Sequence, residues 1–177
     1  MGVGSILDQT LTAQTREDGT VATLPTTILS DADAALLGEY ESWLSRARLT
    51  RKLYCKDCGL DSEVAVFVEP GQIGLTCGHR MLFYQGHVPV RLTEYPEAGE
   101  PALIVRVTIP DEPIAVADAY MLRRYQKFCQ TYGLAEALWC LRCEDEGNPS
   151  GCKAYVRVDR MAILCRCANR VFHGLAV

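Results

Sequence analysis

Each half of this chain carries a CxxC pair followed by a second pair whose members are one residue apart. The two sets are Cys55, Cys58, Cys77 and His79, and Cys140, Cys143, Cys165 and Cys167. Their spacings are C-x2-C-x18-C-x-H and C-x2-C-x21-C-x-C. A CxxC turn places two thiolates side by side, and a second pair across a hairpin completes the tetrahedron that Zn²⁺ prefers. The sequence therefore predicts two structural zinc ions, one in each set.

The repetition extends well beyond the predicted ligands. Residues 23–58 align without a gap with residues 108–143 and share 11 identities in 36 positions. The second pairs align as well, once three extra residues are allowed in the second copy. Self-similarity of this kind indicates one structural unit per repeat. We therefore expect an α+β protein of two tandem repeats, each a helix followed by a zinc-ribbon-like β-hairpin module.

The repeat also sets the expected domain boundaries. Residues 1–22 are predicted to be an extended N-terminal arm, because they are polar and lack a helical pattern. Residues 23–104 are expected to form the first zinc module, with a helix, a zinc ribbon and most of a linking β-hairpin that runs over 87–109. Residues 105–177 form the second module, with a helix and a zinc ribbon. An arm of this kind is poorly ordered alone, so we expect it to lie across neighbouring protein subunits.

A helix is expected in each repeat, immediately before the first CxxC pair. In the first, Ser30 is a plausible N-cap with Asp33 three residues later, which is a capping-box pattern. In the second, Gly133 follows the apolar stripe and is a natural stop. Aromatic and leucine side chains recur at helical spacing in both, as at Tyr40 and Tyr125. These stripes are wide for a single hairpin to cover, so we expect the two helices to pack against each other.

The segment Leu53-Tyr54-Cys55-Lys56-Asp57-Cys58-Gly59 resembles the first knuckle of the zinc-ribbon class of zinc fingers. The resemblance covers about residues 53–84 and 138–173. Two features depart from the pattern: the distal pairs are CxH and CxC rather than CxxC, and Glu144 stands where the second knuckle needs glycine. Zinc ribbons serve in transcription, translation and protein assemblies, so the resemblance implies structural zinc without naming a function.

Three other interpretations of the cysteines are open. They can be buried free thiols, disulfides within an assembled particle, or, for Trp139-Cys140-Leu141-Arg142-Cys143, a redox motif of the thioredoxin type. Cys129 lies on the apolar helix stripe and is assigned to the core. Cys152 has no counterpart in the first repeat and is a spare thiol that can substitute as a ligand. His87 and His173 are assigned to the surface or to packing.

No nucleophile triad, carboxylate pair or phosphate loop is present in the sequence. Each predicted zinc ion has four protein ligands and no position for water, so we expect a protein that is not an enzyme. The favoured hypothesis is a structural or adaptor protein that mediates protein contacts in a larger assembly, such as a virion. Nucleic-acid binding is the alternative, because basic residues cluster near the first site. They are Arg46, Arg48, Arg51, Lys52, Lys56 and Arg80.

Charge and hydropathy limit the possible partners. The formal net charge is −4, without the strong positive excess that phosphate-binding surfaces require. No apolar run reaches the roughly 18 residues that span a membrane. The first residues also lack the basic and apolar regions of a signal peptide. We therefore expect no membrane partner, and a location in a reducing compartment such as the cytoplasm, or in a virion.

Overall fold

The computed structural model describes residues 14–15, 21–22, 24–59, 62–69, 71–86, 109–145, 147, 151–157 and 159–174. Within these ranges the chain combines α-helices and β-strands. A two-stranded sheet of β1 (Gln14–Thr15) and β2 (Val21–Ala22) stands apart from a ten-stranded sheet. Three helices accompany them. None of these helices combines the length and apolar character that crossing a bilayer requires.

The elements of the large sheet fall into two series with the same order along the chain. The first is β3 (Thr26–Ile28), α2 (Asp31–Ala47), β4 (Leu49–Cys55), β5 (Glu63–Glu69), β6 (Gln72–Thr76) and β7 (Met81–Gln85). The second is β8 (Asp111–Pro113), α3 (Val116–Thr131), β9 (Leu134–Cys140), α4 (Leu141–Asp145), β10 (Gly151–Val156), β11 (Arg160–Leu164) and β12 (Asn169–His173). The short helix α4 has no counterpart among the described residues of the first series.

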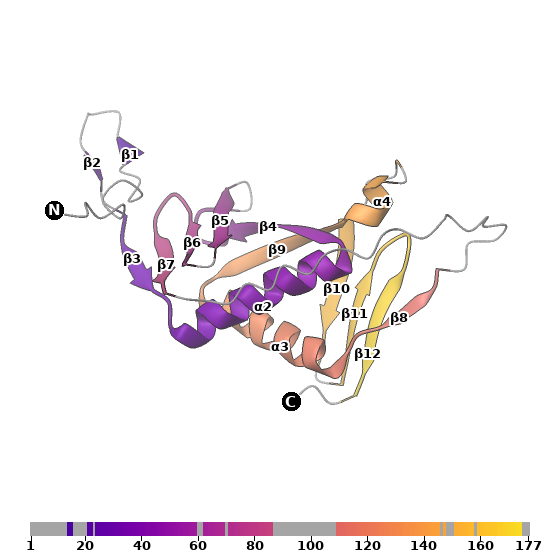
Figure 1. The fold of residues 1–177 in the computed structure, drawn as a ribbon. Helices are drawn as coiled ribbons and strands as arrows, with labels where there is room; N and C mark the ends of the chain where they lie inside the picture. The colour runs from indigo at the N-terminus through magenta and orange to yellow at the C-terminus, as the bar shows by residue number, and fades with distance from the viewer. Residues whose placement is uncertain are drawn as a thin grey trace.

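The strands of both series join in one sheet, in the order β3-β7-β6-β5-β4-β9-β10-β11-β12-β8 (Figure 1). The junction is an antiparallel ladder between β4 and β9 that runs from the Leu49–Cys140 pair to the Cys55–Leu134 pair. Each end of the sheet is a three-residue strand, β3 or β8, which pairs in parallel with its neighbour. The halves are therefore joined into one structure by strands that the hairpin-module prediction did not include.

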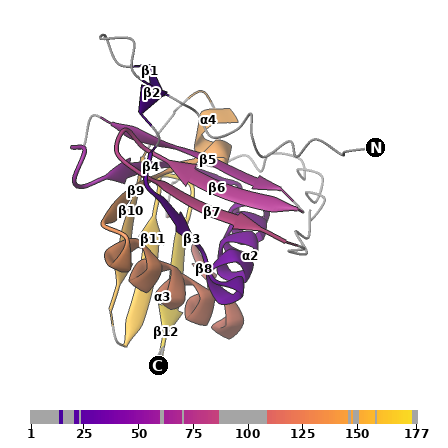
Figure 2. The ribbon, with the colours of Figure 1, turned by 90° about the vertical axis from the view of Figure 1, so that its left-hand side faces the viewer.

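The two long helices lie side by side against the sheet (Figures 1 and 2). α2 packs on β4 and α3 packs on β9, and the helices also contact each other. At this contact the rings of Tyr40 and Tyr125 stack with their centroids 3.6 Å apart. The side chains of Leu37 on α2 and Leu53 on β4 are almost fully buried. The predicted contact between the helices is therefore confirmed, and the core lies between them and the sheet.

Local signals explain where the helices begin and end. The Ser30 hydroxyl accepts a hydrogen bond from the Asp33 backbone N–H at 3.1 Å and caps α2, as predicted. α2 ends at Ala47, and the next residue, Arg48, caps it with a left-handed φ of 52°. α3 ends just before Gly133, whose φ of 61° is one that glycine adopts without steric cost. The predicted stop at Gly133 is therefore confirmed.

Two sequence predictions fall largely outside the described residues. The linking β-hairpin over 87–109 has only Ile109 within them, and His87 is not among them. The arm over 1–22 is described only at the paired strands β1 and β2. The proposed domain boundaries at residues 22 and 104 therefore stay predictions.

Candidate metal centres

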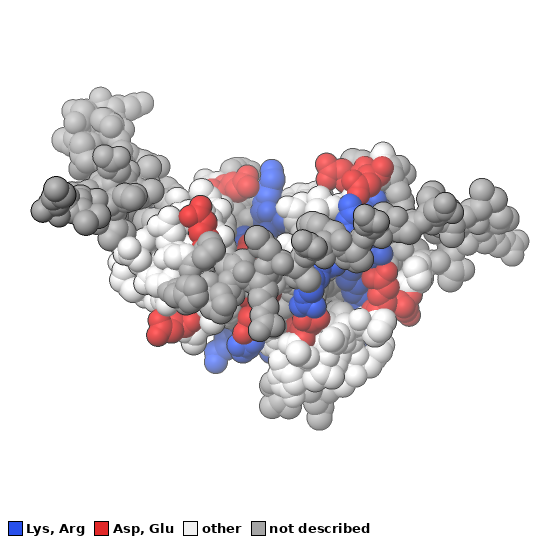
Figure 3. All heavy atoms as spheres, in the orientation of Figure 1, with Lys and Arg blue, Asp and Glu red and all other residues white. Residues whose placement is uncertain are grey.

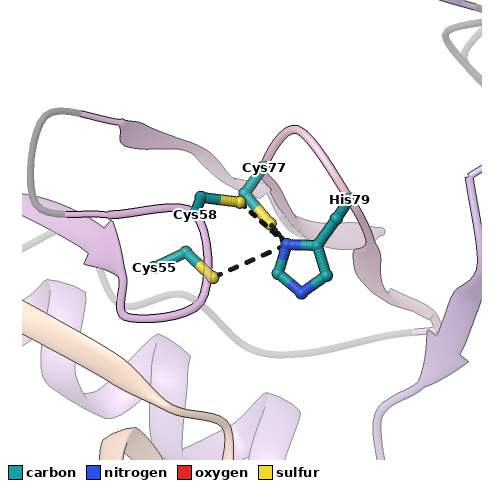
Figure 4. A group of neighbouring side chains, drawn as sticks. All are labelled: Cys55, Cys58, Cys77 and His79. Carbon is teal, nitrogen blue, oxygen red and sulfur yellow. Dashed lines mark hydrogen bonds between the residues drawn. The ribbon is translucent and has the colours of Figure 1, made fainter.

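The first predicted ligand set comes together in a compact cluster. The ligand atoms of Cys55, Cys58, Cys77 and His79 all lie within 4.8 Å of one another. The Nδ1 atom of His79 lies 2.8 Å from the Cys58 Sγ, 3.2 Å from the Cys77 Sγ and 3.7 Å from the Cys55 Sγ (Figure 4). The three sulfurs thus face a single ring nitrogen, which is the arrangement of donors around a small cation.

Each ligand of this first centre sits where a strand gives way to a turn. Cys55 is the last residue of β4, and Cys58 lies in the turn that follows. Gly59 closes that turn with a φ of 98°, which a side chain would disfavour. Cys77 follows β6, and its backbone N–H donates to the Arg80 carbonyl at 3.1 Å. The ends of β4 and β6 therefore position the Cys55–Cys58 pair and the Cys77–His79 pair next to each other.

The second set also clusters, with four sulfurs within 4.8 Å of one another. The Cys167 Sγ lies 3.2 Å from the Cys165 Sγ and 3.4 Å from the Cys140 Sγ. Cys140 ends β9, and Cys165 follows β11. The Cys165 backbone N–H donates to the Ala168 carbonyl at 3.2 Å, which repeats the turn of the first centre. This cluster is the more enclosed, because three of its four cysteines are buried.

The second CxxC pair departs from a zinc-ribbon knuckle in one respect. Cys143 lies within the short helix α4, whereas the first pair is joined by a turn. Glu144 stands where the first centre has Gly59, so the positive φ that ends the first turn is disfavoured here. The chain continues instead as a helical turn, and the pair still converges on the same cluster.

Backbone N–H groups help to keep the first thiol of each CxxC pair ionised. Burial raises the pKa of Cys140, but a hydrogen bond from the Cys143 N–H and bonds from neighbouring thiols bring it down to about 7. At Cys55 burial acts in the same direction, and hydrogen bonds from the N–H groups of Cys58 and Asp57 leave its pKa lowered. Metals bind the thiolate, so this arrangement favours metal binding.

A carboxylate lies behind the imidazole of the first centre. The Asp57 Oδ2 is 3.8 Å from the Nε2 of His79, on the side of the ring away from the sulfurs. A carboxylate on this side of the ring helps to orient a metal-binding histidine. Nδ1 is the ring nitrogen that faces the three sulfurs and would bind a metal here, which the sequence did not indicate.

Sequence reasoning also missed two arginines that link each centre to the opposite half. Arg80, next to His79, donates to the Tyr132 carbonyl at the end of α3. Arg170, on β12, donates to the Ala47 carbonyl at the end of α2 at 2.8 Å. Cations stabilise the carbonyl end of a helix. Each arginine thus ties the half that carries one centre to the helix of the other half.

The remaining candidates take simpler places. Cys129 is buried in the core as predicted, and burial raises its pKa to about 12. Cys152 is half-buried beside the second centre, where burial and the nearby thiolates raise its pKa to about 12, but it is outside the four-sulfur cluster. His173 is exposed at the end of β12. All nine cysteines lie in described ranges, and none forms a disulfide within the chain.

The donor chemistry of both clusters fits a metal. Three thiolates with one imidazole, and four thiolates, are both sets that Zn²⁺ accepts. The two groups are therefore compatible with two zinc ions and with zinc-finger-like modules. Comparisons with protein-family models, with curated proteins and with solved structures find no match.

Proposed function

We propose that this chain is a non-catalytic, zinc-stabilised structural or adaptor protein that mediates protein–protein contacts in a larger assembly. The observation that carries the proposal is the pair of four-donor clusters at the two ends of the β4–β9 ladder. Four protein donors leave a tetrahedral zinc no open position for water or substrate. Each zinc ion then stabilises the fold, and the function belongs to the surface.

We also infer that the fold is built from two tandem zinc-ribbon-like repeats. Three features of the ladder support this. Lys52 pairs with Ala137, the residue 85 positions later, so the ladder is centred on equivalent positions. The Lys56 N–H donates to the Gly133 carbonyl at 2.9 Å, and the equivalent Leu141 N–H donates to the Arg48 carbonyl, also at 2.9 Å. An internal pseudo-twofold axis between repeats accounts for all three.

The contacts of the basic residues near the first centre favour protein contacts over nucleic-acid binding. Arg80 donates to a helix carbonyl, and four other members of the cluster lie against carboxylates. The pairs are Arg46 with Asp118, Arg48 with Asp145, Arg51 with Glu41 and Glu136, and Lys52 with Glu63. Lys and Arg also alternate with Asp and Glu over the face in Figure 3. Phosphate-binding surfaces need unneutralised cations.

The edge of the sheet at β3 is the surface that suits a protein partner best. Within the described residues β3 pairs only with β7, and Ile28 is 70% exposed there. An edge strand presents unpaired backbone groups that another chain can pair with. The predicted arm comes shortly before β3 in the sequence, so we propose that both take part in the contact. A virion subunit is one assembly that fits this arrangement.

A native mass spectrum, compared with a denatured one, tests the zinc part of the proposal. We expect a native mass higher by two zinc ions, and seven thiols that react only after chelation, one for each cysteine in the two clusters. A folded protein that carries no metal would contradict it.

Binding to a generic duplex DNA and a single-stranded RNA at several salt concentrations tests the rest. We expect no appreciable binding at physiological salt. Affinity that falls steeply as salt rises would favour the nucleic-acid alternative instead.

A further inference from the structure

A pocket of about 300 Å³ opens between α3 and the strands β9, β10 and β11. Its walls are mainly apolar and come from all four elements. They include Leu122, Leu134, Leu138, Val156, Met161 and Ile163. Ala154 and Tyr155 are exposed and lie at its rim. An apolar cleft of this size with a few converging polar groups is the usual form of a small-molecule site.

One carboxylate, that of Glu136, lines this pocket, and its side chain is only 16% exposed. Its Oε1 accepts from the Tyr40 hydroxyl at 2.5 Å and from the Tyr125 hydroxyl at 3.4 Å, and lies 3.7 Å from the Arg51 Nε. Every one of these contacts, which are those found within the described part of the chain, uses Oε1. The second oxygen, Oε2, is therefore left to accept from a bound molecule.

The Glu136 carboxylate is only partly neutralised by the positive charges around it. Arg51 is shared, because its Nη2 pairs with Glu41 while only its Nε approaches Glu136. Lys56 also acts on this region, but it is exposed, so water screens its charge. The Tyr40 and Tyr125 hydroxyls and the Cys129 thiol, which also line the pocket, have raised pKa values and are neutral at pH 7. Two carboxylates thus share one buried guanidinium.

We propose that this pocket binds a small apolar amine, whose ammonium group donates to Oε2 of Glu136 while its hydrocarbon part fills the space beneath α3. A charge-assisted hydrogen bond to a partly buried carboxylate is stronger than a neutral one. The apolar walls favour a compact aromatic or branched aliphatic body. None of the residues that line the pocket belongs to either candidate metal centre, and the site does not depend on the proposed adaptor role.

The first half of the chain holds a natural comparison. A pocket of about 260 Å³ lies between α2 and β4–β5, and is lined by Leu44, Leu49, Arg51 and Val66. Arg51 stands there at the repeat position of Glu136, and Val66 narrows the space where the second pocket has Ala154. The Glu41 carboxylate also lines this first pocket, but it is paired with Arg51, whose charge disfavours an amine there. Binding is therefore expected in the second pocket alone.

Titration of the ¹⁵N-labelled, zinc-loaded full chain with benzylamine at pH 8, followed by NMR, tests this inference. We expect saturable shifts of the Gln126, Gln130 and Ala154 amides, and none at Leu44 and Val66. Benzyl alcohol has the same shape without the charge and should bind roughly tenfold or more weakly. Glu136→Gln keeps the shape of the side chain and should weaken benzylamine binding by a similar factor, while binding of benzyl alcohol stays the same.

Ala154→Leu places a larger side chain at the rim and should abolish binding of both probes. Its zinc content and amide spectrum away from the pocket serve as the control for folding. Equal affinity for benzylamine and benzyl alcohol would overturn the assignment of Glu136. The absence of saturable shifts in the second pocket at millimolar probe, in the folded parent chain, would overturn the pocket itself.

Discussion

At the scale of single residues, oppositely charged side chains occupy equivalent positions in the two repeats and meet where the two halves contact each other. Arg51 and Glu136 are 85 residues apart and lie 3.7 Å from each other. Glu39 and Arg124 are also 85 residues apart and pair at 2.6 Å. If the two halves were identical, like charges would face each other at both places and repel. The sequence difference between the halves therefore makes their contact favourable.

The buried carboxylate of Glu136 predicts a pH dependence of stability. Burial raises its pKa from 4.5 to about 7, and the opposing effects of the Tyr40 hydrogen bond and the Arg51 charge are smaller. The folded state then holds this proton more tightly than the unfolded state. The contribution of this protonated carboxyl to the free energy of unfolding is complete below about pH 4.5 and is lost as the pH rises through about 7. The loss is on the order of 3 kcal/mol.

Urea unfolding of the parent and of Glu136→Gln between pH 5 and pH 8 measures this effect. The free energy of unfolding of the parent should fall with pH relative to the variant, because glutamine does not titrate. Other groups, including the metal ligands, are common to both proteins and cancel in the difference. Parallel curves for the two proteins would rule out the assigned shift.

At the scale of elements, the helices and the candidate ligands could be predicted from the sequence, but the pairing of β4 with β9 could not. The cap at Ser30 and the stop at Gly133 are local signals, so both could be read directly. β4 alternates buried Leu49 and Leu53 with exposed Thr50 and Lys52, which is a strand pattern. From the sequence alone, its basic residues Arg51 and Lys52 are interpreted instead as part of a basic cluster near the first metal centre. Which strand pairs with which depends on contacts 85 residues apart, and local patterns do not encode this.

The same distinction applies to the candidate metal centres. The spacing of the eight ligands was enough to predict both clusters, because the repeat supplied an independent check. The contacts of Arg80 and Arg170 with the opposite helices could not be predicted in the same way. They depend on how the two halves pack, and the two arginines do not occupy equivalent positions in the repeats.

The contact between α2 and α3 predicts a large difference between two tyrosines of the same helix. Tyr125 is buried and stacks on Tyr40, whereas Tyr120 is 40% exposed. Tyr125→Ala should lower the free energy of unfolding by about 3–5 kcal/mol, because it leaves a cavity and removes the stacked ring. Tyr120→Ala, the matched control, should change it by less than about 0.5 kcal/mol. Similar losses in denaturant unfolding would refute the assigned contact.

The hydrogen bond from Arg80 predicts a local effect on the end of α3. In Arg80→Met the Tyr132 carbonyl loses this donor, so the last turn of α3 should open more often. Amide hydrogen exchange should speed up there and stay unchanged in the last turn of α2, which Arg170 still holds. Faster exchange at both helix ends would point to a global loss of stability rather than to this contact.

At the scale of the whole molecule, the two candidate centres lie at opposite ends of the ladder that joins the halves. Cys55 pairs with Leu134 at one end, and Cys140 pairs with Leu49 at the other. A metal in the first centre would therefore hold the CxxC turn of the first half next to the start of β9. A metal in the second centre would hold the CxxC pair of the second half next to the start of β4. Loss of a metal should weaken the contact between halves as well as its own hairpin.

The difference in enclosure predicts an order of metal loss. The His79 side chain is 42% exposed, whereas the second centre has three buried cysteines. A zinc chelator should remove one metal quickly from the first centre and the second slowly, with unfolding after the second step. Structural zinc contributes about 10–16 kcal/mol in small domains, so the metal-free chain should not stay folded.

Native mass spectra recorded during chelation, together with circular dichroism, follow both steps. Cys152→Ser should retain both metals and the same order of loss, because Cys152 is outside the clusters. Cys58→Ser should retain only the metal of the second centre. Simultaneous loss of both metals from the parent chain would contradict the predicted order.

The central ladder has a consequence for synthesis on the ribosome. Until Leu134–Cys140 has emerged, β4 of the nascent chain has no partner on the side that β9 later occupies. At translation rates of about 5–20 residues per second, the 85 residues between equivalent positions take roughly 4–17 s. Lys52, at the middle of this temporary edge, is the kind of residue that discourages pairing with another chain. A ribosome that stalls in this interval would hold a half-molecule with an open strand, which is a substrate for chaperones.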